Sequence, residues 1–215
     1  EFRMVGSADS IASPNTTLNA IVAEAFCEAA DELEKSKNFE KSVHDMIKKN
    51  LTEHQRVIFN GNGYSDEWIA EAEKRGLPNI KSSIEAASSI TTKKAVKLFE
   101  KFGIFTKTEL VSREEIIYET YAKSINIEAL TMIGMAGKQI IPAVIEYSKE
   151  LADTINSVKA AGGDASIEKE QLKKVSELLG KMQKALEKLR IEDKKASEVE
   201  DPKKQAFYYK DKLIG

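Results

Sequence analysis

One periodic run of apolar residues constrains the fold of this 215-residue chain more than any other feature. Between Thr106 and Ala161, apolar side chains recur every three or four residues, which places them on one face of a helix. Strand residues alternate with a period of two and cannot produce this spacing. At about 1.5 Å per residue the helix would be roughly 80 Å long, longer than a compact domain of this size is wide. The run therefore predicts a very long helix that reaches from one packed body into another. Its members are Tyr118, Ala122, Ile125, Ala129, Met132, Ala136, Ile140, Ala143, Tyr147, Leu151, Ile155 and Val158.

The middle of this helix is apolar around most of its circumference. Additional apolar residues between Ile125 and Ile145 widen the stripe, so we expect this part to be buried on most sides. A membrane span is the alternative, but polar residues such as Asn126 and Glu128 would each be costly in lipid. A buried helix of a soluble protein is the preferred interpretation. Pro142 lacks the N–H that would bond to the carbonyl of residue 138, which predicts a kink.

Composition and charge indicate a globular helical protein with no strong attraction to polyanions. Hydrophobic residues make up 41% and charged residues 32% of the chain, enough to bury a core. A net charge of −2 argues against nucleic-acid binding. A single cysteine, Cys27, excludes an internal disulfide, and no signal peptide or lipidation motif is present, so we expect a cytoplasmic protein. Because the first residues include no initiator methionine, we expect the chain to be a piece of a longer protein.

Before the long helix, the sequence predicts several shorter ones. Ser13 as N-cap with Pro14 in the first turn predicts a helix to about Lys35. Thr106 and Glu109 have the spacing of a capping box, which would begin the long helix. Further helices are predicted at residues 39–58, 65–76, 82–89 and 92–102.

The run Asn60 to Gly63 predicts a turn, because asparagine and glycine tolerate backbone conformations that other residues avoid. A glycine-rich turn before a helix could cradle a phosphate group. Here Asp66 and Glu67 occupy the first turn of the following helix, where a phosphate would need to bind. We therefore predict a capped structural turn without phosphate binding.

The last third of the chain predicts a helical hairpin. Apolar residues from Leu172 to Leu189 recur with alternating spacings of three and four in a helix over 166–193, which is a heptad seam. A short turn at Gly162 and Gly163 separates it from the long helix, so the two should pack antiparallel. Residues 194–203 are expected to be a charged linker, and an apolar element is expected from Phe207 onward.

Two charged residues at the start of the chain could share a site. In an extended strand, residues two apart point to the same side, so Glu1 and Arg3 would project together. Taken by itself, this spacing is more typical of an exposed ion pair.

Three stretches together resemble the C-terminal part of type III glutamine synthetases. They are Glu1 to Ser7, the run Phe59 to Trp68 with Glu73 to Leu77, and Ile127 to Ala129. The resemblance covers nearly the whole chain, and Phe59 to Trp68 is its most specific motif. It implies a fragment of an ATP-dependent ligase that makes glutamine from glutamate and ammonia through γ-glutamyl phosphate, in a ring-forming homo-oligomer.

The resemblance also implies roles for the two residues at the start. The final barrel strand of glutamine synthetases carries a Glu-x-Arg, whose glutamate ligates a divalent metal and whose arginine contacts the transferring phosphoryl group and substrate. Glu1 and Arg3 match these positions, with Mg²⁺ or Mn²⁺ and ATP as the implied cofactors of the parent enzyme. One carboxylate and one arginine do not complete such a site, so the fragment is expected to be an inactive helical scaffold that binds no cofactor.

The expected architecture is an all-α multi-helix bundle. It contains one very long kinked helix and an antiparallel helical hairpin, preceded by a remnant of a catalytic-barrel strand. By the resemblance, residues 1–124 are the C-terminal helical part of the catalytic domain, and residues 125–215 are a helical domain particular to type III. The alternative function is a non-catalytic helical module that binds another protein through the heptad seam and the long helix.

Overall fold

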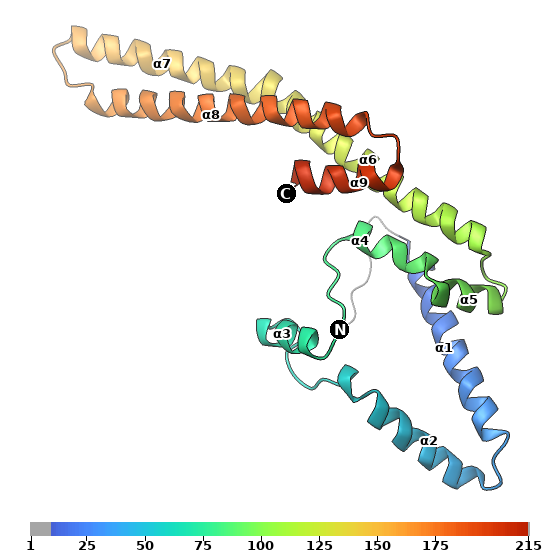
Figure 1. Cartoon of the computed structure of the whole chain (residues 1–215). Coiled ribbons are helices and arrows are strands. Elements are labelled where there is room, and N and C mark those ends of the chain that lie inside the picture. The colour runs from blue at the N-terminus through green and yellow to red at the C-terminus, as the bar shows by residue number, and fades with distance from the viewer. Residues whose placement is uncertain (1–9, 215) are drawn as a thin grey trace. The chain divides into compact units, whose positions relative to one another are not determined.

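A computed structural model describes residues 10–214 of the chain, and within that range every regular element is a helix (Figure 1). The predicted all-α fold is confirmed. The strand remnant expected at the start of the chain lies outside the described residues. By their packing, the described residues divide into two compact units, the first ending at Ser112 and the second beginning at Arg113. The assignment of residues 1–124 and 125–215 to two enzyme domains stays a prediction.

The first unit is built from short helices around a small core. Its elements are α1 (Ala12–Leu33), α2 (Phe39–Glu53), η1 (Gln55–Val57), α3 (Asp66–Lys74), α4 (Ser83–Ala87), η2 (Ser88–Thr91) and α5 (Lys93–Lys101). Ala20 from α1, Phe99 from α5 and Leu110 form the centre of the core, with Phe99 tilted against Phe105. Apolar contact therefore joins α1 and α5 to the residues around Leu110.

The start of α1 differs from the prediction. The helix begins at Ala12, and Ser13 is a helical residue rather than the N-cap. The hydroxyl of Ser10 instead accepts a hydrogen bond from the Ala12 amide at 3.2 Å. Pro14 still lies in the first turn, where its missing N–H has no intrahelical partner to lose. The N-cap position is Ile11, whose side chain makes no capping hydrogen bond.

The predicted end of α2 is also wrong, because the helix ends earlier in the chain than predicted. The helix ends at Glu53 and is followed by η1, whereas the sequence predicted one helix to Ile58. The amide of Ile58 bonds to the carbonyl of Gln55 in the tighter pattern of η1.

The predicted long helix is confirmed, from Lys107 to Ala160 without a break. It consists of α6 (Lys107–Met135), the π-helical turn η3 (Ala136–Ile140) and α7 (Ile141–Ala160). The capping box that begins it is present, since the Glu109 carboxylate accepts from the Thr106 amide at 2.8 Å. The kink predicted at Pro142 stays a prediction. A π turn lies directly before this residue, and in it the Ile141 amide bonds to the carbonyl of Ala136.

The second unit contains the predicted antiparallel hairpin. After a tight turn, α8 (Ser166–Ser197) runs back along α7 (Figure 1). Gly162 has φ of 82°, a value that L side chains rarely adopt, and the Gly163 amide bonds to the carbonyl of Val158. The hairpin turn therefore uses glycine where the backbone requires it. Along the hairpin, Leu151 and Ile155 of α7 are buried.

The predicted linker at residues 194–203 is wrong. Helix α8 continues to Ser197, and α9 (Pro202–Tyr209) begins after a short connection and is followed by η4 (Lys210–Ile214). Asp201 caps α9 by accepting from the Lys204 amide at 2.8 Å, with Pro202 at the first helical position. Ala196 and Ala206 are fully buried, so this charged stretch contributes to a core.

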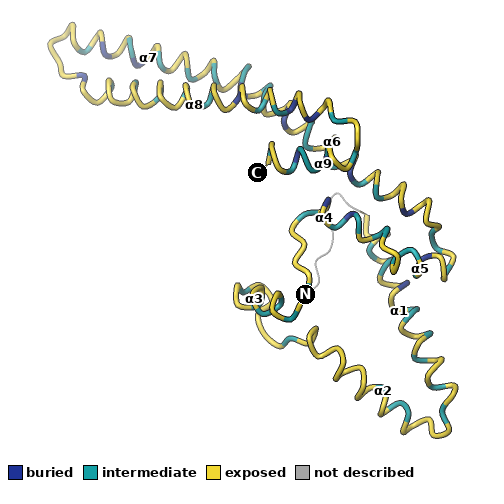
Figure 2. The backbone as a smooth tube through the Cα atoms, in the orientation of Figure 1, coloured by how far each residue is buried: buried dark blue, intermediate teal, exposed yellow. Residues whose placement is uncertain are grey.

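The prediction that the middle of the long helix is buried on most sides is wrong. Figure 2 shows only scattered buried positions along α6 and α7. Within the second unit, Ala122 of α6 is buried in a cluster with Ala196 of α8 and Tyr209 of α9. Other apolar residues of the long helix are exposed, among them Ile127, Leu130, Met132, Met135 and Ile145.

Candidate functional site

The two residues predicted to act in catalysis, Glu1 and Arg3, lie outside the described residues. Their roles stay predictions. Two clusters of polar side chains lie entirely within the described residues. The sequence analysis assigned a role to neither. One is built on the Phe59 to Trp68 motif in the first unit, and the other lies between α6, α8 and α9 in the second.

Arg75 organises the first cluster, which we call the Arg75 cluster. Its Nε donates to Glu71 Oε1 at 2.7 Å, one helical turn earlier in α3, and its Nη1 donates to the carbonyl of Ile58 at 2.9 Å. The hydrogen bond from Arg75 lowers the pKa of the Glu71 carboxyl. A guanidinium can make these bonds at once because its donors are fixed in a planar fork. Arg75 therefore ties the end of α3 to the segment that follows η1.

The Arg75 cluster also contains a pair of stacked aromatic rings. The rings of Phe59 and Trp68 are stacked with centroids 3.9 Å apart, and the Arg75 guanidinium lies 5.5 Å from the Trp68 ring. A Cβ added at Gly61 would come within 2.7 Å of the Phe59 ring, so only glycine fits there without movement. The described glycines with positive φ do not include Gly61 or Gly63, so the turn needs Gly61 for space rather than for its dihedral angles.

The start of α3 already satisfies its own donors. Ser65 Oγ accepts from the Trp68 amide at 3.3 Å, and the Asn62 side chain accepts from the Tyr64 amide at 3.1 Å. Hydrogen bonds from its own backbone amide and from Ser65 lower the pKa of Glu67, which indicates a charged carboxylate at the helix start. The absence of phosphate binding stays a prediction.

Replacing Arg75 with lysine should loosen this cluster. Arg75→Lys keeps the positive charge but loses the fork, so the bonds to Glu71 and to the Ile58 carbonyl cannot both be kept. We expect the free energy of unfolding of the first unit to fall by about 1–2 kcal/mol. Trp68 is the only tryptophan in the sequence, so its fluorescence during urea unfolding measures this change.

The control is Glu73→Gln, an exposed position on the same helix, which should leave the urea midpoint unchanged. Acid titration adds a second readout, because the folded-state pKa of Glu71 lies below its ordinary value of 4.5. The stability that Glu71 contributes is present above that ordinary value and is lost as pH falls through the lower folded value. Arg75→Lys should weaken this acid dependence, and an identical acid profile in both proteins would contradict the assigned bond.

A buried polar network forms the second cluster, which we call the Asn126 network. The Asn126 side-chain amide of α6 donates to Asp193 Oδ1 of α8 at 3.0 Å and to the Tyr209 hydroxyl of α9 at 3.0 Å. Asp193 is 7% and Tyr209 is 2% exposed. Burial raises the pKa of Tyr209, so its hydroxyl stays neutral at physiological pH. One amide thus joins three helices of the second unit.

Surrounding tyrosines extend the polar contacts outward. Tyr208 donates to Glu192 Oε2 at 2.8 Å, and Tyr118 donates to Glu114 Oε1 at 3.0 Å. The Glu192 carboxyl has a lowered pKa, first because Lys195 bonds to it and then because Tyr208 does. Every buried side-chain polar atom of the described residues has a hydrogen-bond partner. Such fully satisfied networks specify packing rather than leave a group free for reaction.

Sequence reasoning missed both clusters because their partners are distant in the chain. Asn126 was noted only as a cost against membrane insertion, although a polar residue within an apolar stripe is itself a sign of a buried partner. Arg75 was read as part of a family motif without a role. Its bond to Ile58 joins residues 17 positions apart.

The described residues offer little for metal chemistry. From residue 10 to residue 214, no group of three or more histidine, cysteine or acidic side chains is placed to hold a metal ion. In the same range, no helix combines the length and the apolar character needed to cross a membrane. The Arg75 cluster joins α3 to the segment before it, and the Asn126 network joins α6, α8 and α9.

Comparison with known proteins identifies the family. Residues 42–159, more than half of the chain, match the family model described as "Glutamine synthetase C-terminal domain". A glutamine synthetase from Butyrivibrio fibrisolvens is 39% identical over 176 residues, which are 81% of this chain and 25% of the relative. The type-3 glutamine synthetase of Dictyostelium discoideum is 38% identical over 161 residues, 74% of this chain and 22% of the relative.

A third relative extends the match along almost the whole chain. The glutamine synthetase of Bacteroides fragilis (strain YCH46) is 28% identical over 221 aligned residues, which cover 98% of this chain and 30% of the relative. The chain thus spans between about a fifth and a third of the length of these relatives. The matched residues include the Arg75 cluster, Asn126 and the long helix as far as Lys159. The chain belongs to the family of glutamine synthetase C-terminal domains.

Proposed function

We propose that this chain is the helical C-terminal part of an ATP-dependent ligase that makes glutamine from glutamate and ammonia through γ-glutamyl phosphate. One observation carries the proposal: residues 42–159 match the C-terminal domain of glutamine synthetases. The names of the relatives support it, since each is called a glutamine synthetase and one a type-3 enzyme.

The chain's own contribution is structural. The described polar clusters consist of groups already paired with one another, such as Asn126 with Asp193 and Arg75 with Glu71. A catalytic acid, base or nucleophile would need an uncommitted group within reach of a substrate. We therefore propose that the 215 residues alone have no ligase activity and hold helices in place for the parent enzyme.

Glu1 and Arg3 are the proposed contacts with the reaction centre. A carboxylate oxygen suits Mg²⁺ or Mn²⁺, and bound metal would neutralise charge on the phosphoryl group being transferred from ATP. One carboxylate makes an incomplete metal site, so Glu1 would be one ligand among several from other parts of the parent protein. The Arg3 guanidinium would hold phosphoryl oxygens with its fork and stabilise their charge. By the same resemblance, the parent is proposed to be a cytoplasmic, ring-forming homo-oligomer.

The test compares the isolated chain with a full-length protein that contains it. The full-length protein should form glutamine only when glutamate, ammonia, ATP and Mg²⁺ or Mn²⁺ are all present, and the isolated chain should form none. Glutamine formation without ATP would contradict the proposed γ-glutamyl phosphate route. Activity of the isolated chain would contradict the scaffold role.

A non-catalytic helical interaction module is the second candidate. The exposed apolar residues along α6 and α7, with Ile127 63% and Met132 61% exposed, favour a binding role for this surface. The two candidates differ in the assay above, because an interaction module would remain inactive in the full-length protein.

A further inference from the structure

The residues that the long helix covers, meaning those that are buried or half-buried, change their spacing at the π turn. In α6, one line of them lies seven residues apart, at Ala122, Ala129 and Ala136. Continued into α7, this seven-residue frame falls on three exposed residues, which are Ala143, Glu150 and Ser157. The covered residues of α7 lie one position later, at Val144, Leu151 and Val158. The line in α7 is therefore displaced by one residue from the line in α6.

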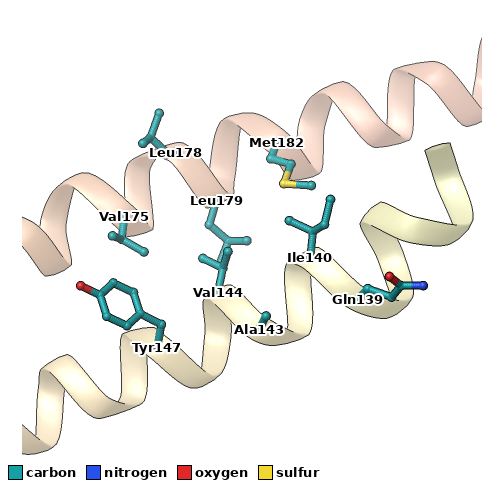
Figure 3. A pocket seen from close by; sticks show the side chains of 9 residues that line it. All are labelled: Gln139, Ile140, Ala143, Val144, Tyr147, Val175, Leu178, Leu179 and Met182. Atoms are coloured by element: carbon teal, nitrogen blue, oxygen red, sulfur yellow. The ribbon is translucent and has the colours of Figure 1, made fainter.

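A second line of covered residues shows the same displacement. In α6 it contains Asn126 and Ile133, which are half-buried and seven residues apart. Its regular continuation in α7 is exposed, at Ile140, Tyr147 and Thr154. One position later the residues are half-buried or buried, at Ile141, Ser148 and Ile155. Figure 3 shows Val144 pointing toward Leu179 of α8, with Ile140 and Tyr147 flanking it along α7.

Helix α8 keeps one frame along its whole contact with the long helix. Its covered residues form two sets with members seven residues apart, which are Leu172, Leu179, Leu186 and Asp193, and Val175, Met182, Leu189 and Ala196. Two hydrogen bonds place α8 beside the long helix on both sides of the π turn. The Asn126 amide donates to Asp193 at 3.0 Å, and the Gln171 amide donates to the Tyr147 hydroxyl at 2.6 Å. Helix α8 thus presents one unbroken frame to both α6 and α7.

One extra residue in a regular helix would break this match. At 3.6 residues per turn, one residue more rotates everything after it by about 100°. That rotation would turn Leu151 and Ile155 away from α8. A π turn cancels it, because its hydrogen bond spans five residues instead of four and so takes up one residue. The Ile141 amide bonds to the Ala136 carbonyl, and these two covered residues are the ones that lie five apart instead of four.

We propose that the π turn takes up one residue beyond the seven-residue frame and so holds α6 and α7 on a single seam against α8. The turn itself lies next to α8. A Cβ added at Gly137 would come within 3.2 Å of Arg190 Nη2, so the guanidinium of α8 lies directly against the turn. Helix α8 therefore packs across the turn, where a loss of frame would be felt on both sides.

Pro142 offers a different cause for the π turn. It follows the turn closely, lacks an N–H, and its ring would crowd the carbonyl four residues earlier in a regular helix. The seam gives a cause that acts along all of α7, because without the turn its covered residues as far as Val158 would leave α8. Pro142→Ala separates the two causes, since it restores the N–H and leaves the number of residues unchanged. We expect a crystal structure of Pro142→Ala to keep the π turn.

Removing one residue tests the residue count directly, in the whole chain carrying Pro142→Ala so that no proline opposes a regular helix. Deleting Lys138, an exposed residue of the π turn, should give a regular helix with α7 still facing α8. Hydrogen exchange along α7 and α8 should stay within about twofold of that in Pro142→Ala. Deleting Lys149, an exposed lysine of α7, is the control matched in residue type, charge and chain length. It rotates either the residues before it or those after it away from α8, so exchange along both helices should be at least about tenfold faster.

Two results would overturn the proposal. One is a regular helix through residues 136–141 in the Pro142→Ala structure, which would assign the π turn to the proline. The other is equal exchange in the two deletion proteins, which would mean that the frame of α7 does not depend on the number of residues in the turn. Both readouts concern the second unit alone, so they are independent of whether the parent protein is a ligase.

Discussion

Leu151→Asp should lower the free energy of unfolding of the second unit by about 3–5 kcal/mol. Leu151 is 8% exposed on α7, on the side that packs against α8. The substitution removes apolar packing and leaves a carboxylate without a partner in the seam, and both effects destabilise. Hydrogen exchange measured by mass spectrometry should show faster exchange along α7 and α8 while α1 and α5 keep their protection.

Ile145→Asp is the control on the same helix. Ile145 is 55% exposed, so an aspartate there stays hydrated and should change stability by about 0.5 kcal/mol or less. Equal destabilisation by the two substitutions would mean that α7 packs with a different face against α8. Unchanged exchange in Leu151→Asp would show that the antiparallel hairpin does not stabilise the second unit.

Periodicity predicted the elements that depend on local sequence. The apolar spacing from Tyr118 to Val158 was enough to predict the long helix, because a helix repeats its face every 3.6 residues whatever surrounds it. The hairpin followed from two stripes joined by the short turn at Gly162. Asp201 with Pro202 was an equally local signal, but the high charge around it favoured a linker and the helix start was missed.

Burial could not be predicted in the same way. A wide apolar stripe indicates a surface that could pack against another element. Only the folded structure shows whether such an element covers it. Leu130 is 52% exposed although the pattern predicted a buried position. The Asn126 network had the same difficulty, since its amide meets residues 67 and 83 positions away. Contacts of that range depend on how α8 and α9 fold back, which no local pattern contains.

In the full-length protein, Arg3→Lys should lower kcat by about a hundredfold. If Arg3 holds phosphoryl oxygens as proposed, lysine keeps the positive charge but loses the paired donors of the guanidinium. The loss of one charge-stabilising donor in a transition state has this typical size. Steady-state glutamine formation at saturating ATP and glutamate measures it, and helix content should match that of the unmodified protein.

Glu1→Gln in the same protein should act on the metal rather than on the turnover step. The amide keeps the shape of glutamate but removes a negative ligand, so a higher concentration of Mg²⁺ or Mn²⁺ should be needed for half-maximal activity. The two variants therefore separate the proposed roles, one changing kcat at saturating metal and the other changing the metal dependence. If both proteins kept the unmodified rate and metal dependence, the roles proposed for Glu1 and Arg3 would be wrong even though the chain belongs to the family.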